Sequence, residues 1–364
     1  MKHILVSPLS WGLGHATRDL PIIRYLLERG HHVTIAAEGR ALTLLQDEVP
    51  ACDFEHLPDY PPPYSSGKRF VPTFVATAPK MLAAIEKEAA NVRKLLEKRS
   101  FDLILSDNRF KVRADGVPSF VITHQLRFMT PPGLEVFEHA TELFNAKYLR
   151  AFDRIIVPDA ADPVENLSGR LSHDLQWMDD SPRVYYAGPF SSVRRLDVEQ
   201  DVDLFISISG PEPPRTELEK TILEKVRDVE GDRIIVALGK PEVKDVRTID
   251  GRIEVHGFLG REQQQAMLNR ARFVVCRSGY TTVMELAELG RKALFIPTPG
   301  QTEQVYLGEY YEERGYFHTV DQYELDLPRD IEKAKTYAGP PFACDTRANV
   351  ERLYRDLFAP ALET

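Results

Sequence analysis

The sequence is poor in cysteine, with Cys52, Cys276 and Cys344 as the only three in 364 residues. They are odd in number and far apart, and no Cys-x-x-Cys pair occurs, so neither a disulfide framework nor a cysteine zinc site is indicated. The sequence also has no HExxH, Walker, EF-hand or Ser-His-Asp pattern. These absences disfavour zinc proteases, P-loop nucleotidases, EF-hand proteins and serine hydrolases.

Long hydrophobic runs are also absent, and no apolar segment approaches the roughly 18 residues that a membrane-spanning helix needs. The first residues lead directly into an apolar strand, without the charged and then apolar segments of a secretory leader. We therefore expect a cytoplasmic protein that is neither secreted nor transmembrane. Peripheral contact with a membrane stays open.

Positive charge is in deficit, with 46 Lys and Arg against 55 Asp and Glu, a formal net charge of −9. This acidic excess argues against a general affinity for nucleic acid or for anionic membranes. The length of 364 residues is sufficient for two domains, each with a core of its own. We therefore predict two domains and no nucleic-acid partner.

The most informative stretch runs from Phe273 to Gln304 and alternates strand, turn, helix, strand and polar loop. The turn Arg277-Ser278-Gly279 separates an apolar strand from a helix with apolar residues at helical spacing. At such a helix N-terminus Ser278 can cap, Gly279 lets a ligand approach the backbone, and the free N–H groups favour a phosphate.

Glu285 lies one to two turns into the same helix, where its carboxylate can accept two hydrogen bonds from vicinal hydroxyls such as those of a ribose. An isolated glutamate on a helix is usually solvated surface. The interpretation therefore depends on the combination of Glu285 with the turn before it and with the polar segment 301–304 after the next strand. Together these features predict a nucleotide-sugar site.

This stretch resembles the donor site of GT-B glycosyltransferases, and most of all the MurG-type transferases of peptidoglycan synthesis. Those enzymes hold a UDP-sugar with a CRSG turn, a Thr, a helix Glu and a downstream Gln. The resemblance implies that the turn faces the diphosphate, Glu285 binds the ribose, Glu303 and Gln304 meet the sugar hydroxyls, and the uracil packs near Phe258. The donor-binding residues implied in the second half are Ser209, Gly210, Phe258, Leu259, Arg277, Ser278, Gly279, Thr282, Glu285, Glu303 and Gln304.

Two departures from the MurG pattern occur. Val305 follows Gln304 where the pattern continues to an Asn, so the resemblance does not identify the sugar as N-acetylglucosamine. In the loop 209–213 prolines replace most of the glycines, and proline has no N–H to donate. Arg215 could compensate as a partner for the phosphates.

A Gly-rich loop follows the first predicted strand, residues 4–8, and precedes a helix over 16–29. It lacks the third glycine of the dinucleotide fingerprint, which disfavours a dehydrogenase. The loop resembles the first loop of GT-B enzymes. That resemblance implies that Gly14 lies near the donor phosphate and that His15 occupies the position of the family's histidine.

His15 is the candidate catalytic residue. Inverting transfer needs a general base on the face opposite the leaving UDP, and an imidazole with an ordinary pKa near ~6.5 can take a proton at neutral pH. Asp19, one helical turn on, could orient the ring, and Asp107 or His124 could act as the base instead. A structural or phosphate-binding role for His15 is the alternative.

Polar residues follow two further predicted strands, 103–105 and 120–123. Open α/β sheets bind ligands at the carboxyl ends of their strands, so we predict an acceptor site there. Asp and Asn after a strand are also ordinary turn residues, which leaves the site open. The residues placed on the acceptor side are Asp107, Asn108, Arg109 and His124.

Residues 59–79 are rich in proline and aromatic residues, and we predict a long loop there, a candidate lid over the acceptor. The charged segment 194–203 predicts a linker between the domains. Its Asp201-Val202-Asp203 has the letters of a metal-binding DxD motif but is predicted to precede a strand within the linker. We therefore expect no metal and no cofactor, with the UDP-sugar as substrate.

The predicted architecture is α/β, with two doubly wound Rossmann-like domains in a GT-B arrangement around a central cleft. Residues 1–190 form the acceptor-side domain and residues 200–344 the UDP-sugar domain. By resemblance to GT-B proteins, a C-terminal helix over 346–358 packs back on the first domain.

The predicted activity is inverting, metal-independent transfer of a sugar from a UDP-sugar to a hydroxyl of a small-molecule, glycan or lipid-linked acceptor. Two alternatives are an enzyme like the UDP-N-acetylglucosamine 2-epimerase and a non-catalytic sugar-nucleotide-binding subunit. The GLGHATR loop followed by CRSG favours the transferase.

Overall fold

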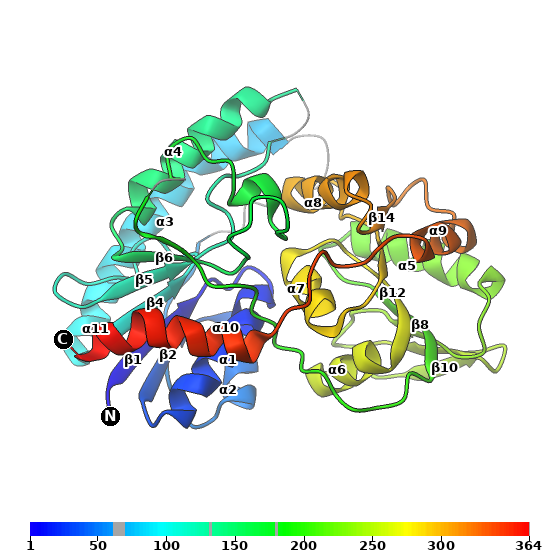
Figure 1. Cartoon of the computed structure of the whole chain (residues 1–364), viewed down its shortest axis with the longest axis horizontal. Coiled ribbons are helices and arrows are strands. Elements are labelled where there is room, and N and C mark those ends of the chain that lie inside the picture. Colours follow the sequence, from blue (N-terminus) through cyan, green and yellow to red (C-terminus); the bar gives the residue numbers. More distant parts are fainter. Residues whose placement is uncertain (61–69, 131–132, 179–180, 364) are drawn as a thin grey trace. The chain divides into compact units, whose positions relative to one another are not determined.

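The computed structural model describes residues 1–60, 70–130, 133–178 and 181–363, and it divides the chain into two compact domains (Figure 1). The first domain comprises the described residues up to Ser192 together with those from Asp345 onward. The second domain runs from Val193 to Cys344. Each domain has one seven-stranded sheet and helices packed against it.

The sheet of the first domain is parallel throughout, in the order β3-β2-β1-β4-β5-β6-β7. Its strands are β1 (His3–Pro8), β2 (His32–Ala37), β3 (Asp53–His56), β4 (Leu103–Asp107), β5 (Ser119–Ile122), β6 (Arg154–Val157) and β7 (Val184–Tyr186). Its helices are α1 (Gly14–Glu28), α2 (Gly39–Glu48), α3 (Phe70–Lys98), α4 (Glu138–Leu149), α10 (Thr346–Leu353) and α11 (Ala359–Glu363).

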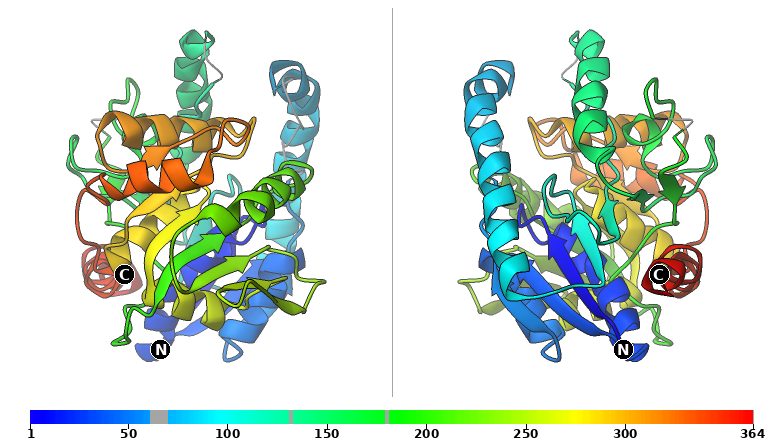
Figure 2. Two further views of the ribbon diagram at one scale, coloured as in Figure 1. Left: turned by 90° about the vertical axis from the view of Figure 1, so that its right-hand side faces the viewer. Right: turned by 90° about the vertical axis from the view of Figure 1, so that its left-hand side faces the viewer.

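Alternation along β1 assigns these helices to the two faces of the sheet, because successive side chains of a strand point to opposite sides. Ile4 and Val6 share a core with α1, α2 and α10, whereas Leu5 shares another with Val92 and Leu95 of α3. Figure 2 shows α3 standing apart from α1 and α2. The C-terminal helix α10 therefore belongs to the core of the first domain.

The predicted loop over 59–79 is wrong in its second half, because α3 begins at Phe70 and includes Pro79. A proline inside a helix removes only one backbone donor. The helix continues through it because its later turns bury Ile85, Val92 and Leu95. The part of the predicted lid at 61–69 lies outside the described residues.

The second domain has the strand order β10-β11-β9-β8-β12-β13-β14, parallel except for the antiparallel pair β10 and β11. Its strands are β8 (Val202–Ser207), β9 (Ile234–Ala237), β10 (Val246–Ile249), β11 (Ile253–His256), β12 (Ala271–Cys276), β13 (Ala293–Phe295) and β14 (His318–Thr319). Its helices are α5 (Pro214–Lys225), α6 (Arg261–Arg270), α7 (Tyr280–Leu289), α8 (Thr302–Glu313) and α9 (Leu327–Lys335).

The acidic pair of the DxD sequence is engaged in ion pairs. Asp203 lies within β8, not before it, and pairs with Arg272 at 2.6 Å. Asp201 pairs with Arg270 at 2.5 Å and with Arg233 at 2.6 Å. Within the described residues no group of three or more His, Cys, Asp or Glu side chains could hold a metal ion.

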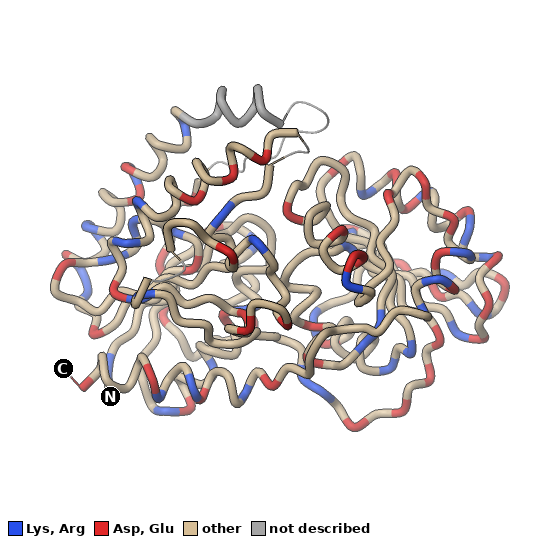
Figure 3. The backbone as a smooth tube through the Cα atoms, turned by 45° about the horizontal axis from the view of Figure 1, so that its top comes forward, with Lys and Arg blue, Asp and Glu red and all other residues tan. Residues whose placement is uncertain are grey.

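Acidic and basic residues are interspersed along the helices of each domain (Figure 3). No helix in the described part of the chain is long and apolar enough to cross a membrane.

The contribution of α10 to the first core can be tested with two leucines near the C-terminus. Leu353 is fully buried against α1, so Leu353→Ala should lower the free energy of unfolding by about 2 to 5 kcal/mol. Leu357 is only partly buried in the same cluster, and Leu357→Ala should lower it by less. Urea denaturation of both variants measures the difference. Equal losses would contradict the burial of α10.

Candidate active site

Each sheet has one point at which the strand order reverses, between β1 and β4 in the first domain and between β8 and β12 in the second. Loops that leave the carboxyl ends of two such strands diverge and open a crevice, the usual ligand site of open α/β sheets. His15 follows β1, and Asp107 ends β4. In the second domain Ser209 follows β8, and Arg277 follows β12.

His15 and Asp107 are in direct contact. The imidazole Nδ1 lies 2.9 Å from Asp107 Oδ1. His15 lies in the first turn of α1, one residue after its start at Gly14, and its side chain is 15% exposed. Asp107 is fully buried. The carboxylate therefore fixes the ring from behind, while the ring itself is within reach of solvent.

Arg18, one turn along α1 from His15, ties this cluster together. Its Nε donates to Asp107 Oδ2 at 2.7 Å, and its Nη2 contacts Asp107 Oδ1. Its Nη1 lies 2.9 Å from His124 Nδ1, and its Nη2 lies 3.0 Å from His15 Nδ1. The sequence analysis missed Arg18, although its spacing of three residues from His15 places both on one face of α1.

The pKa values of the two aspartates of the cluster are shifted in opposite directions. Burial alone would raise the pKa of Asp107, but the charge of Arg18 and the contacts with His15 hold that pKa below its ordinary range. For Asp19, burial raises the pKa well above its ordinary value, and the neighbouring Asp107 raises it further. The surroundings therefore favour the ionised form of Asp107 and the protonated form of Asp19.

Asp19 does not orient His15, contrary to the expectation from sequence. It is fully buried, and neither carboxyl oxygen has a hydrogen-bond partner among the described groups. Asp19 does lie one helical turn from His15, as predicted. The carboxylate that contacts the ring, however, is that of Asp107 on β4.

Arg109 also differs from its predicted place on the acceptor side. Its side chain is fully buried and pairs with Glu88 of α3, with Nε 2.7 Å from Glu88 Oε1. Asn108, partly buried beside it, adopts the left-handed conformation with φ of 56°. His124 is buried against Arg18. Of the four acceptor-side residues, Asp107 and His124 join the His15 cluster, whereas Arg109 anchors α3.

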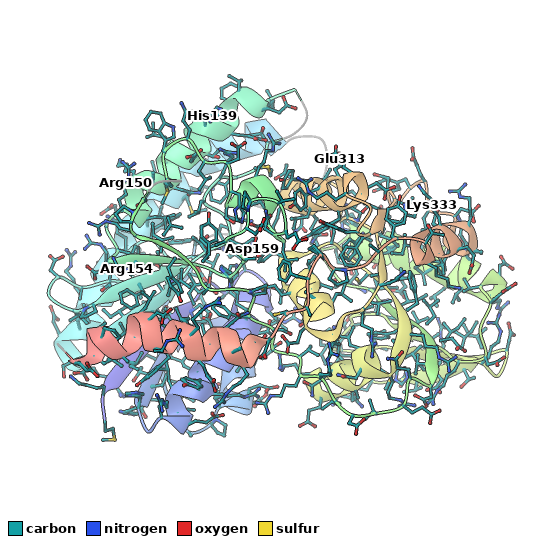
Figure 4. The ribbon with its side chains drawn as sticks, viewed as in Figure 1. His139, Arg150, Arg154, Asp159, Glu313 and Lys333 are labelled. Atoms are coloured by element: carbon teal, nitrogen blue, oxygen red, sulfur yellow. The ribbon has the colours of Figure 1, made fainter. Side chains whose placement is uncertain are left out.

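Asp159, labelled in Figure 4, organises the loop after β6. It is fully buried and accepts hydrogen bonds from the backbone N–H groups of Leu167 at 2.9 Å and Ser168 at 2.8 Å. The ordered loop was missed because an Asp after a strand is also an ordinary turn residue.

In the second domain, the turn after β12 begins α7 with Gly279 at its N-cap and no side-chain cap. Ser278 does not cap, contrary to expectation. It is fully buried, and its Oγ donates to the carbonyl oxygen of Gln304 at 2.7 Å. Gln304 in turn accepts from the backbone N–H of Thr298 at 2.9 Å. Ser278 and Gln304 thus join the loops that precede α7 and α8.

Two arginines near these loops also have partners that the sequence did not indicate. Arg277 is 2% exposed, and its guanidinium points into backbone carbonyl groups, not toward solvent. Arg215, proposed as a phosphate partner, is buried and paired with Glu212 and with Glu219. Neither side chain is free to contact a ligand directly.

The remaining donor-side residues lie on elements that surround the same edge of the second sheet. Thr282 and Glu285 are partly buried on α7, and Glu303 is in the first turn of α8. Phe258 is 41% exposed, whereas the side chain of Leu259 is buried before α6. Phe258 is therefore accessible to a flat ring.

Comparison with known proteins supports this description. A model of the glycosyltransferase family 28 C-terminal domain matches residues 217–338. An uncharacterized glycosyltransferase of Methanosarcina mazei is 22% identical over 98% of this chain and 95% of its own length. The structure of MurG from Acinetobacter baumannii aligns with a TM-score of 0.60 at 14% identity, over 98% of this chain and all of its own.

The chain is similar to MurG, has the GT-B fold and carries a glycosyltransferase family 28 C-terminal domain. The predicted fold and transferase activity are thereby confirmed. A shorter match, 39% identical over 72 residues, covers 18% of the transferase and 20% of a Histophilus somni protein. That protein is named UDP-N-acetylglucosamine–N-acetylmuramyl-(pentapeptide) pyrophosphoryl-undecaprenol N-acetylglucosamine transferase. The family match in the transferase includes Phe258 through Gln304 but not Ser209 and Gly210.

The opposite pKa shifts of Asp19 and Asp107 predict opposite pH profiles for two variants. An unfolded Asp has a pKa of about 3.9. The pKa of Asp19 is higher in the folded state than in the unfolded state. The free energy of unfolding therefore falls as the pH rises from the unfolded-state pKa to the folded-state pKa. Asn cannot ionise, so Asp19→Asn should gain stability relative to wild type between pH 3.5 and 7, by at most about 1.4 kcal/mol per pH unit. Urea denaturation at several pH values measures this.

Asp107→Asn is the matched control. The pKa of Asp107 is lower in the folded state, so its contribution to stability is present above pH ~4 and is lost as the pH falls. The stability deficit of Asp107→Asn should therefore be largest at neutral pH and shrink toward acid. Profiles of the same sign for both variants would contradict the assigned charges.

Proposed function

We propose that the transferase moves a sugar from a UDP-sugar to a hydroxyl group of its acceptor, with inversion and without a metal ion. The observation that carries the proposal is the contact of His15 Nδ1 with Asp107 Oδ1, 2.9 Å apart, at the reversal point of the first sheet. A histidine that solvent can reach and that a buried carboxylate holds in place is the arrangement of a general base.

In the proposed reaction, the Nδ1–H group of His15 donates a hydrogen bond to the ionised Asp107. The other ring nitrogen, Nε2, carries no proton and has a lone pair available. Nε2 takes the proton of the acceptor hydroxyl as its oxygen bonds to the anomeric carbon. The bond from that carbon to the diphosphate oxygen breaks, and UDP leaves as an anion. Asp107 stabilises the imidazolium that forms. Arg18 holds Asp107 in place through both carboxylate oxygens.

The donor is assigned to the second domain, where α7 and α8 begin beside one another at the carboxyl edge of the sheet. Backbone N–H groups at helix N-termini favour phosphate and can stabilise the charge that develops on a leaving diphosphate. Glu285 is proposed to bind the ribose hydroxyls, and Glu303 the sugar. The name of the Histophilus relative gives UDP-N-acetylglucosamine as its donor, which supports UDP as the nucleotide.

For the acceptor, the first domain favours a lipid-linked molecule over a soluble glycan or a small polar one. Three large apolar side chains on or just before α4 are exposed: Val136 by 75%, Phe137 by 56% and Leu143 by 51%. Lys147 and Arg150 lie further along the same helix. An apolar surface of this kind suits a lipid anchor and peripheral contact with a membrane.

A thermal-shift screen across nucleotide sugars tests the proposed donor. A UDP-sugar at one hundred times its Kd should stabilise the fold by about 2.7 kcal/mol, whereas the matching GDP- and ADP-sugars should not. Acceptor-dependent release of UDP would then separate a transferase from an epimerase, which retains UDP on its product. Stabilisation by no UDP-sugar would refute the proposed donor.

Substitution of His15 tests the proposed base. His15→Ala should lower turnover by about 10²- to 10⁴-fold, the usual contribution of a positioned base, while UDP affinity stays nearly constant. His32, at the start of β2 and 41% exposed, provides the matched control, since His32→Ala should leave turnover unchanged. Equal losses of turnover and UDP affinity in His15→Ala would make His15 a donor ligand instead.

Substitution of Glu285 tests the ribose assignment. Glu285→Ala should weaken UDP binding by about 1 to 3 kcal/mol, because charge-assisted hydrogen bonds to the ribose are lost. Glu288, three residues further along α7 and also partly buried, serves as the control. Calorimetric titration with UDP compares the two variants. Unchanged affinity in Glu285→Ala would remove Glu285 from the donor site.

A further inference from the structure

Arg277 connects the loops that follow four neighbouring strands of the second sheet. Its guanidinium has five N–H groups, and each one has an oxygen acceptor. The acceptors are the carbonyl oxygens of Ser209 (3.2 Å), Pro214 (3.4 Å), Ile296 (3.0 Å) and Pro297 (3.0 Å), and the side-chain oxygen of Gln322 (2.8 Å). These residues follow β8, β13 and β14, and Arg277 itself follows β12. No N–H group is left for a ligand.

The charge of Arg277, in contrast, is unmatched. The other buried arginines each pair with a carboxylate: Arg18 with Asp107, Arg109 with Glu88, Arg127 with Glu142, and Arg215 with Glu212 and Glu219. Among the described residues, Arg277 has no carboxylate within ion-pair distance. Burial lowers its pKa to about 10, so it remains charged at neutral pH.

An unpaired buried charge is costly, since the penalty for removing one ion from water amounts to several kcal/mol. Five dipoles that point their oxygens at the guanidinium offset part of this cost but cancel no net charge. The start of α7 lies three residues beyond Arg277, and α5 begins at Pro214, one of its acceptors. The N-termini of these helices add partial positive charge at the same edge. An anion bound at this edge would offset the charge of Arg277.

The loop over Arg277 is closely packed, and buried polar atoms beside it lack partners. A Cβ atom on Gly210 would lie 3.8 Å from Arg277 Nε and 3.3 Å from Thr298 Oγ1. Thr298 is fully buried, and its hydroxyl has no hydrogen-bond partner among the described groups. The Nε2 group of Gln322, which is also buried, has none either. The backbone of Gly210 therefore lies close to the buried charge.

We propose that Arg277 is the fixed counter-charge of the donor's diphosphate, acting from beneath the loops that hold it. This inference rests on the proposed function and assigns Arg277 the role of a positioning residue that never touches the phosphates. Because the diphosphate gains negative charge when its bond to the sugar breaks, Arg277 favours the departing UDP over the intact UDP-sugar. The hydrogen bonds to the carbonyl groups hold the loops in position, and the positive charge of Arg277 attracts the diphosphate.

Two substitutions separate charge from loop positioning. Arg277→Lys keeps a cation and Arg277→Gln removes it, while both lose most of the five hydrogen bonds. Arg277→Gln should weaken binding of UDP and of inorganic pyrophosphate at least tenfold and leave binding of uridine, which has no phosphate, nearly unchanged. Arg277→Lys should retain most of the affinity for UDP. Calorimetry serves for UDP and pyrophosphate, and direct NMR titration for uridine.

Equal losses for UDP and uridine would overturn the inference, because displaced loops weaken both ligands alike. Equal losses of UDP affinity in Arg277→Lys and Arg277→Gln would also overturn it. A lysine in this buried site has a lowered pKa, so UDP binding by Arg277→Lys should take up protons and weaken as the pH rises. Uridine binding should not. This pH comparison keeps the test decisive if Arg277→Gln does not fold.

Wild-type protein distinguishes failure of this inference from failure of the proposed function. Binding of pyrophosphate without binding of UDP would support the charge site and refute UDP as the nucleotide. Binding of neither would refute both. Binding of both, with a loss in Arg277→Gln that uridine shares, would refute the role of Arg277 alone.

Discussion

The reversal of strand order within each sheet is the constraint on which the candidate site of each domain depends. Parallel strands bring all their carboxyl ends to one edge, and only at the reversal do two adjacent loops diverge. In the first sheet this places His15 after β1 and Asp107 at the end of β4, 92 positions apart in sequence. In the second it places Ser209 beside Arg277.

Each reversal point contains a buried arginine, and the two arginines differ in whether a carboxylate balances their charge. Arg18 is neutralised by the ionised Asp107, and the pair then serves to hold a histidine. Arg277 is surrounded by neutral carbonyl groups, which stabilise its geometry but not its charge. A proton-transfer site needs a fixed, nearly neutral scaffold, whereas a site for a diphosphate benefits from excess positive charge. A buried arginine thus has a different role in each domain, depending on whether a carboxylate is paired with it.

Much of the fold could be predicted from hydrophobic pattern. Strands such as β1, β4 and β9 are short runs buried on both faces, and α7 has apolar residues at helical spacing. The errors occurred where local signals conflict with packing. Proline suggested a loop over residues that α3 occupies, because sequence cannot show that later turns of the helix are anchored on the sheet.

The residues of the candidate site were recognised by type, but their partners were not. His15, Asp107 and the turn 277–279 could be chosen from motif and strand position alone, because strand ends and helix starts are local features. Whether a side chain faces a ligand or the interior depends on contacts with distant segments. Arg109 pairs with Glu88, Ser278 donates to the carbonyl oxygen of Gln304, and Asp107 takes the place expected for Asp19 beside His15. The sequence by itself determined the fold class, the transferase family and the loops at which chemistry is expected. Only the tertiary structure decided which buried charges are matched, because a counter-ion is set by distance in space and not by spacing along the chain.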